Sequence, residues 1–119
     1  MLSLTSSHRY RLYLPVCDMR KGFDGLSGLV STYMNEEVSS GTVFIFLNRR
    51  GDRIKLLVWE PGGMVIYYKR LEQGTFKRPK PIENSDKLSL NYAQLAMLIE
   101  GVFVEQTRQE KRFLLRSKC

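Results

Sequence analysis

The segment from Thr42 to Leu71 has the sequence TVFIFLNRRGDRIKLLVWEPGGMVIYYKRL and contains three apolar runs separated by two turn signals. The runs are rich in β-branched and aromatic residues, which favour strands. The NRRGD and PGG sequences between them provide asparagine, glycine and proline at turn positions. Connections this short can join only antiparallel neighbours. We therefore expect an antiparallel β-meander made of Thr42–Leu47, Arg53–Glu60 and Met64–Leu71.

Upstream of the meander, the sequence predicts a strand and then a helix. Arg9–Val16 alternates basic or aromatic residues with aliphatic ones, as a strand does. Asp18 is expected to cap the helix that follows, because its carboxylate can accept the free N–H groups of the first turn. The helix should present one apolar stripe, formed by Met19, Phe23, Leu26, Val30 and Tyr33.

Three glycines recur at every third position of this predicted helix, Gly22, Gly25 and Gly28. Each lowers helix stability by up to about 1 kcal/mol relative to alanine. Close approach of another backbone is the usual compensation. We therefore expect Gly22, Gly25 or Gly28 to lie against backbone, with no space for a side chain.

Downstream, the GTFKRPKP sequence interrupts the strand pattern, because prolines 79 and 81 are incompatible with a central strand. Ser89 precedes a second amphipathic helix, whose apolar residues are Leu90, Leu95, Leu98, Ile99 and Val102. We expect residues 1–104 to form a single α+β domain, an antiparallel sheet with one helix before it and one after it. Residues 105–119 form a basic C-terminal tail, and the sequence leaves open whether it is a helix, a strand or a frayed end, or part of the domain.

Most of the net charge of +7 lies in one stretch of the chain. Residues 49–80 carry nine basic and three acidic side chains, whereas residues 1–48 carry four of each. A concentrated basic field attracts polyanions. The predicted phosphate-binding surface consists of six cations at one end of the meander, Arg49, Arg50, Arg53, Lys55, Lys69 and Arg70. Aromatic side chains available there for stacking or for sheet packing are Trp59, Tyr67 and Tyr68.

Arg20 and Lys21 fall in the first turn of the first predicted helix, where the helix dipole disfavours cations. A phosphate or an acidic partner at that N-terminus would relieve the conflict. The alternative is a pair of solvated side chains. We include both residues in the predicted nucleic-acid-binding set.

The sequence offers little for catalysis, for a metal or for a membrane span. His8 is the only histidine, and Cys17 and Cys119 stand far apart. This is too few ligands for a zinc site, and no nucleophile–base pair is evident. Glu36 and Glu37 are expected to form a solvated loop pair. No apolar run approaches the roughly 20 residues that span a bilayer. We expect no enzyme activity, no cofactor, no small-molecule substrate and a cytoplasmic protein with reduced thiols.

Several sequence blocks stand in a recognisable order: DMRKGFDGL from Asp18, VFIF from Val43, NRRGDRIK from Asn48, Trp59, and YKRLEQGTF from Tyr68 followed by Pro79. In these blocks the chain resembles the accessory proteins of the insertion-sequence-66 family of bacterial transposons, the second-open-reading-frame proteins often labelled TnpB. Leu95–Gly101 is similar to the C-terminal segment of that family. Arg78 departs from the pattern, because the family usually has tryptophan there.

The resemblance implies a protein encoded beside a DDE-type transposase and a second small accessory protein, and a role in supporting transposition. Two hypotheses follow for the molecular activity. In the first, the basic hairpin face binds DNA. In the second, the protein is an adaptor whose glycine-bearing helix and aromatic sheet face bind the transposase or the other element-encoded protein, without direct DNA contact. Salt distinguishes them, since phosphate binding weakens steeply with salt and protein contacts need not.

Overall fold

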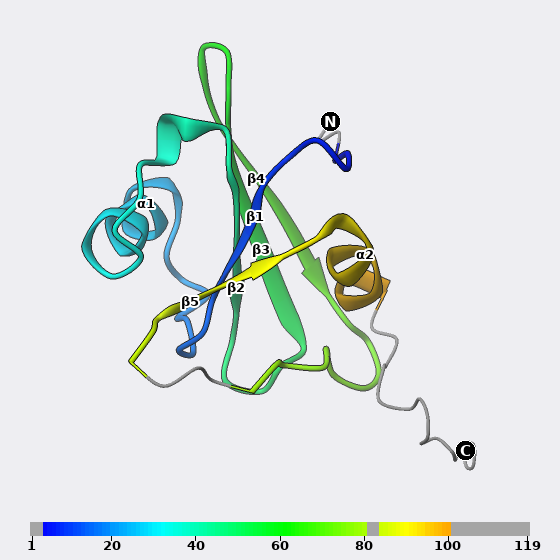
Figure 1. Cartoon of the computed structure of the whole chain (residues 1–119). Coiled ribbons are helices and arrows are strands. Elements are labelled where there is room, and N and C mark those ends of the chain that lie inside the picture. Colours follow the sequence, from blue (N-terminus) through cyan, green and yellow to red (C-terminus); the bar gives the residue numbers. More distant parts are fainter. Residues whose placement is uncertain (1–3, 81–83, 101–119) are drawn as a thin grey trace.

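A five-stranded sheet lies between two helices, one on each face (Figure 1). The computed structural model describes residues 4–80 and 84–100. In chain order the elements are β1 (Tyr10–Tyr13), α1 (Phe23–Thr32), the short 3-10 helix η1 (Val38–Ser40), β2 (Val43–Leu47), β3 (Arg53–Glu60), β4 (Gly63–Arg70), β5 (Lys87–Leu90) and α2 (Tyr92–Glu100). The strand order in the sheet is β4-β3-β2-β1-β5. β1 runs parallel to β2, and every other pair is antiparallel.

The predicted α+β domain with its β2–β3–β4 meander is confirmed, and the sheet gains two strands. β1 lies within the predicted strand Arg9–Val16. β5 falls where the sequence predicted the start of the second helix, because Ser89 and Leu90 pair with Arg11 and Tyr10 of β1. The predicted boundary at residue 104, the tail at residues 105–119 and Val102 lie outside the described residues.

The cap of α2 is formed by the residue that follows β5. The side chain of Asn91 accepts the N–H of Gln94 at 2.7 Å, and the side chain of Gln94 accepts the N–H of Asn91 at 2.9 Å. This reciprocal pair is a capping box. It starts α2 after Asn91, which leaves the chain before Asn91 free to extend the sheet.

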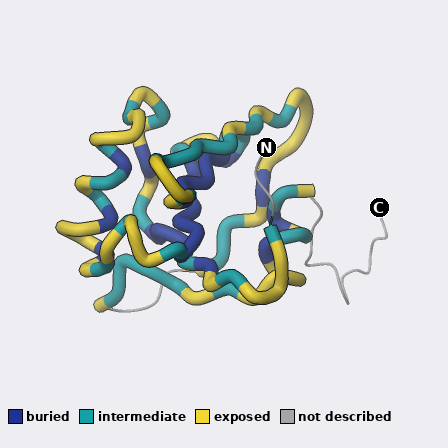
Figure 2. The backbone as a smooth tube through the Cα atoms, turned by 90° about the horizontal axis from the view of Figure 1, so that it is seen from above, coloured by how far each residue is buried: buried dark blue, intermediate teal, exposed yellow. Residues whose placement is uncertain are grey.

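Each face of the sheet carries its own buried core, one towards each helix. Towards α2, strand residues such as Leu12, Ile45 and Leu56 pack with Leu95 and Leu98 of the helix. Towards α1, the second core contains Phe44, Phe46, Leu57, Leu26, Val30 and Met34. Strand side chains alternate between faces, so burial on both sides explains why all of β2 is buried. Figure 2 shows this buried centre as the dark stretches of the tube.

Cys17 lies in the α1-side core. Burial raises the pKa of its thiol to about 11. The thiol therefore stays protonated at neutral pH, and the nucleophilic thiolate is scarce.

The expected N-cap of the first helix is wrong, because α1 begins only at Phe23 and Gly22 occupies the cap position without a side-chain bond. Asp18 instead closes a separate turn before the helix. Its Oδ1 accepts the N–H of Arg20 at 2.9 Å, and its carbonyl accepts the N–H of Lys21 at 3.1 Å. Both cations therefore precede the helix, and the predicted conflict with the helix dipole does not arise.

The predicted apolar stripe is only partly correct. Leu26 and Val30 are buried, whereas Phe23 and Tyr33 are 47% and 55% exposed. The buried stripe is completed by Met34 just beyond the helix. The shift follows from the late start of α1, which leaves Met19 in the preceding turn.

The predicted close packing of the α1 glycines is also wrong. A Cβ built at Gly22 or Gly28 would meet no atom within 4 Å, and one at Gly25 would meet only the side chain of Lys21. No backbone among the described residues presses on these positions. Their loss of helix propensity is therefore not offset by packing within this part of the chain.

Changing Gly28 to alanine is expected to raise the free energy of unfolding by about 0.5–1 kcal/mol, because alanine restrains the unfolded chain and favours the helix. Urea denaturation followed by circular dichroism measures this. The matched control is Gly25→Ala, whose methyl would lie 3.0 Å from the Cβ of Lys21 and should give a smaller gain or a loss. A clear destabilisation by Gly28→Ala would contradict the open environment of that glycine.

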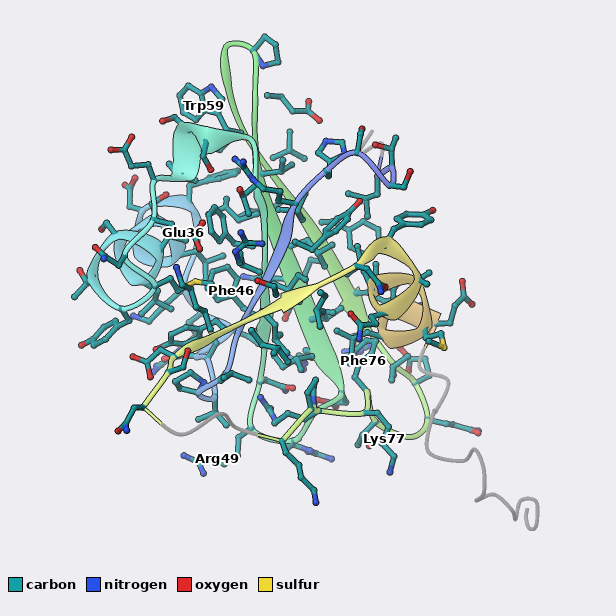
Figure 3. The ribbon with its side chains drawn as sticks, viewed as in Figure 1. Glu36, Phe46, Arg49, Trp59, Phe76 and Lys77 are labelled. Carbon is teal, nitrogen blue, oxygen red and sulfur yellow. The ribbon has the colours of Figure 1, made fainter. Side chains whose placement is uncertain are left out.

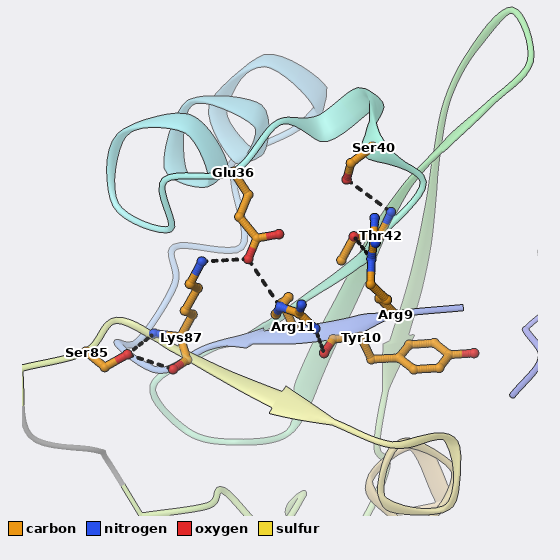
Figure 4. A network of polar contacts seen from close by, with 8 residues as sticks. All are labelled: Arg9, Tyr10, Arg11, Glu36, Ser40, Thr42, Ser85 and Lys87. Carbon is orange, nitrogen blue, oxygen red and sulfur yellow. Dashed lines mark hydrogen bonds and ion pairs between the residues drawn. The ribbon is translucent and has the colours of Figure 1, made fainter. Parts of the chain in front are cut away.

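Glu36 is the centre of an ion network that joins the loop after α1 to β1 and β5 (Figure 4). Its Oε2 accepts Nζ of Lys87 at 2.7 Å and Nε of Arg11 at 3.2 Å. Its side chain is only 17% exposed. The expectation of a solvated loop pair with Glu37 is therefore wrong for Glu36, because β5 brings to it a cation that lies 51 residues further along the chain.

Candidate nucleic-acid interface

The turn between β2 and β3 is organised by the side chain of Asn48. Its Oδ1 accepts the N–H groups of Gly51 at 2.9 Å and Arg53 at 3.0 Å, and its Nδ2 donates to the carboxylate of Asp52 at 2.8 Å. Gly51 has φ +78°, a left-handed conformation that glycine adopts without strain. These bonds fix the backbone on both sides of the two arginines at the tip of the turn.

The carboxylate of Asp52 is held ionised by its surroundings. The hydrogen bond from Asn48 lowers the pKa of this carboxyl most, and the nearby charges of Arg50 and Arg53 lower it further. One negative charge therefore stays within the turn and offsets part of the repulsion among its arginines.

The segment after β4 supports the same turn. Phe76 is buried, and its N–H donates to the carbonyl of Gly51 at 2.7 Å. Arg78 donates through Nη2 to the carbonyl of Asn48. Burial lowers the pKa of Arg78, whose Nη1 is buried without a partner in the described part of the chain. Where the family resemblance leads us to expect tryptophan, this chain thus has a cation that binds the turn.

A cleft of about 360 Å³ opens between this turn and the turn that precedes α1. It is lined by Asp18, Met19, Arg20, Asn48, Arg49, Arg50 and Arg53, and we call it the basic cleft. Four of these residues are arginines from two segments far apart in sequence. Arg49 projects away from the body of the protein (Figure 3). The structure therefore brings together four of the eight predicted site residues.

Arg49 and Arg50 are available to a ligand. Within residues 4–80 and 84–100, neither forms a hydrogen bond or an ion pair. Each guanidinium carries five N–H donors in a planar fork that matches the oxygens of a phosphate. The tip of the turn therefore presents two guanidinium groups that have no partner among the described residues, on a backbone that hydrogen bonds hold fixed.

Arg20 enters the basic cleft as half of an ion pair with Asp18. Its Nη2 lies 2.7 Å from Oδ2, and its Nε lies 3.1 Å from Oδ1. These side-chain bonds, with the backbone N–H bond of Arg20, lower the pKa of Asp18 to about 2. Exposed pairs contribute little to stability. The pair instead orients one guanidinium and places one carboxylate in the cleft.

Lys55 is not a surface cation, which corrects the prediction. It is 7% exposed, and its Nζ donates to the carbonyls of Met19 at 2.8 Å and Lys21 at 2.9 Å. These two carbonyls flank Arg20 in sequence. Lys55 therefore supports the wall of the basic cleft from inside the protein.

Lys69 also lies away from the predicted surface. Its Nζ donates to the carbonyl of Ile99 in α2 at 2.9 Å. Its neighbour Arg70 projects from the other face of β4, where it is the cross-strand neighbour of Arg53. The Nη2 of Arg70 lies 3.1 Å from Oε2 of Glu72. The expected single surface of six cations is therefore wrong for Lys55 and Lys69, since one is buried and the other faces α2.

The three predicted stacking aromatics are separated by the fold. Trp59 lies near the far end of β3 from Arg49 (Figure 3). Tyr67 packs against the α2-side core. Only Tyr68 adjoins the basic cleft, because its hydroxyl accepts a long hydrogen bond of 3.4 Å from Nη1 of Arg53.

Asp18, Met19 and Asn48 line the cleft although the sequence predicted no binding role for them. An asparagine three residues before a glycine is a recognisable turn signal, so the role of Asn48 was open to prediction. Among the residues that the structure describes, no three histidine, cysteine, aspartate or glutamate side chains gather as metal ligands. No described helix is long and apolar enough to cross a membrane.

The fold and the cleft define a small α+β protein with an arginine-lined cleft built on a hairpin turn. The chain belongs to the family described as IS66 Orf2 like protein, whose family model matches residues 8–109. This confirms the resemblance and associates the protein with insertion-element transposition in an accessory role.

Two relatives come from Sinorhizobium fredii (strain NBRC 101917 / NGR234). The chain is 31% identical to the uncharacterized protein y4jC over 85 residues, which cover 71% of each chain. It is 29% identical to the uncharacterized protein y4hO over 102 residues, covering 83% of this chain and 86% of the relative. No solved structure matches the chain at a significant level.

Proposed function

We propose that the protein is a non-enzymatic accessory factor of transposition that binds DNA through the basic cleft. One observation carries the proposal: Arg20 from one turn and Arg49, Arg50 and Arg53 from another converge on a single cleft. Like charges repel, so such a cluster is favourable chiefly when it meets a polyanion. Guanidinium forks bind phosphate oxygens in two-point contacts, which suits them to a nucleic-acid backbone.

Cations at the margin extend the proposed contact surface. Arg70 faces the same side of the sheet as Arg53, and Lys21 follows Arg20 in the turn. Lys55 and Lys69 are left out of this surface, because the ammonium of each donates to backbone carbonyls within the fold. Phosphate contacts position a protein on DNA without reading its sequence, so binding should show little base selectivity. The transposase and the second small protein of the element are the protein partners that we infer.

Fluorescence anisotropy with a labelled DNA duplex, measured across a series of salt concentrations, tests the proposal. Log affinity should fall linearly with log salt, with a slope of roughly −0.9 for each phosphate contact. The matched control is Arg9→Gln, which removes an exposed cation at the other end of β2 and should leave the slope unchanged. If the wild-type protein shows no salt-sensitive binding, the proposal fails. Capture of the transposase with and without DNA then tests the adaptor alternative.

Changing Asp18 to asparagine is expected to tighten DNA binding and to make the salt slope more negative by up to about 0.9, because the change releases Arg20 for a phosphate. Asparagine keeps the oxygen that accepts the N–H of Arg20, so the turn should persist. The control is Glu72→Gln, which releases Arg70 outside the cleft and should have a smaller effect. Weaker binding by Asp18→Asn in the same anisotropy assay would contradict this prediction and would show that the ion pair holds Arg20 in its binding position.

A further inference from the structure

The ring of Tyr68 is left outside both hydrophobic cores. It is 48% exposed, whereas its neighbour Tyr67 packs against the α2-side core. Ile66 and Met64, on the same face of β4 as Tyr68, pack against the α1-side core. Packing within the described structure therefore accounts for Met64 and Ile66 and leaves the exposed half of the Tyr68 ring unexplained.

Cations hold the Tyr68 ring in place beside the basic cleft. Nζ of Lys55 lies 4.6 Å from the ring centroid, in a cation–π contact. Nη1 of Arg53 donates to the hydroxyl. Arg70 lies two residues along β4 on the same face, about 7 Å away at the usual strand rise. The ring is thus oriented by the buried ammonium of Lys55 and contacted at its hydroxyl by the guanidinium of Arg53, and Arg70 is the next residue on the same strand face.

We propose that Tyr68 is a stacking platform for an unpaired base, and that the site binds single-stranded DNA in preference to duplex. The inference rests on the proposed function and specifies its ligand. Every base has a π face, so stacking on an aromatic side chain tolerates any sequence. In a duplex the base faces are covered by their neighbours, and exposing one requires unstacking. In this arrangement Arg53 and the other arginines of the basic cleft contact the phosphates on either side of the stacked base.

The test compares Tyr68→Leu with the wild-type protein in binding a labelled oligothymidylate and a duplex of the same length. The wild-type protein should bind the oligothymidylate more tightly. Loss of one stacked base should weaken oligothymidylate binding by about 5- to 150-fold. Duplex affinity should change less than about twofold, and both salt slopes should persist because no phosphate contact is lost. Equal losses on both DNAs, or no loss on either, would overturn the inference.

Two control variants separate stacking from other roles of the ring. Tyr68→Phe keeps the aromatic face and removes the hydroxyl that Arg53 contacts, so it should retain most single-strand affinity. Tyr33→Leu removes another exposed tyrosine, at the end of α1, and should change nothing. If Arg49, Arg50 and Arg53 prove necessary for binding while Tyr68→Leu binds normally, only this inference fails. If the wild-type protein binds neither DNA in a salt-sensitive way, the proposed function fails with it.

Crosslinking on the wild-type protein gives a readout that needs no variant to fold. Ultraviolet irradiation with a bromouracil-substituted oligothymidylate should join a base to Tyr68, identified by mass spectrometry. Trp59, the only tryptophan, lies at the other end of β3, so its fluorescence should not be quenched by the oligothymidylate. Crosslinks that map to Trp59 and leave Tyr68 unmodified would reject the platform.

Discussion

A variant with Arg49, Arg50 and Arg53 all changed to alanine is expected to bind DNA about 500-fold more weakly than the wild-type protein at 0.1 M salt. The three side chains line one cleft, and two of them have no partner among the residues described. Loss of three phosphate contacts should flatten the salt slope by about 2.7. Log affinity is linear in log salt. If the two proteins bind DNA equally well near 1 M salt, a slope difference of about 2.7 therefore makes their affinities differ by about 500-fold at 0.1 M salt.

Anisotropy titrations at several salt concentrations give the affinity and the slope together. The variant should fold normally, because Arg49 and Arg50 are exposed and the turn is fixed by the side chain of Asn48. Thermal denaturation checks this. An unchanged slope in a folded variant would reject the basic cleft as the DNA site. Single substitutions should each change the slope by roughly 0.9, which distinguishes direct contacts from a general charge effect.

Lys55→Met is expected to lower the free energy of unfolding by about 1–3 kcal/mol, because the carbonyls of Met19 and Lys21 then lose a buried donor. Methionine keeps much of the apolar stem. Lys55→Glu should cost more, about 3–5 kcal/mol, since a buried carboxylate would face two carbonyl oxygens. Urea denaturation measures both effects.

We also expect Lys55→Met to weaken DNA binding, although Lys55 itself is not a proposed DNA contact. The reason is that Arg20 loses the fixed backbone on either side of it. A double-mutant cycle with Arg20→Ala should therefore show a coupling energy of at least about 0.5 kcal/mol in binding. Lys69→Met is the matched control, because it removes a comparable hydrogen bond on the opposite face. It should lower stability and leave DNA affinity nearly unchanged. Additive effects of Lys55→Met and Arg20→Ala would contradict the supporting role.

The meander was predictable because its evidence is local. Alternating apolar residues and turn sequences specify β2, β3 and β4 without reference to the rest of the chain. The strand β5 was missed because it is short and depends on β1, which is distant in sequence. Ser89 is a common helix-cap residue, so the local pattern favoured a helix that the strand pairing overrides.

The candidate site was predicted in part for a similar reason. The arginines of one turn stand together in the sequence, so their clustering was visible. The strand alternation already separates Lys69 from Arg70, and applying it to β4 would have removed Lys69 from the set. The burial of Lys55 could not be found this way, because its acceptors are backbone carbonyls 36 and 34 residues away.

The place of β1 between β2 and β5 has a consequence for synthesis on the ribosome. Synthesis proceeds from the N-terminus, so Tyr10–Tyr13 emerges early and its neighbour Lys87–Leu90 emerges much later. Until then β1 is an unpaired sheet edge, and the α2 side of the sheet has no cover. Such surfaces promote aggregation of incomplete chains. A premature stop between β4 and β5 should therefore yield an insoluble product rather than a smaller working protein.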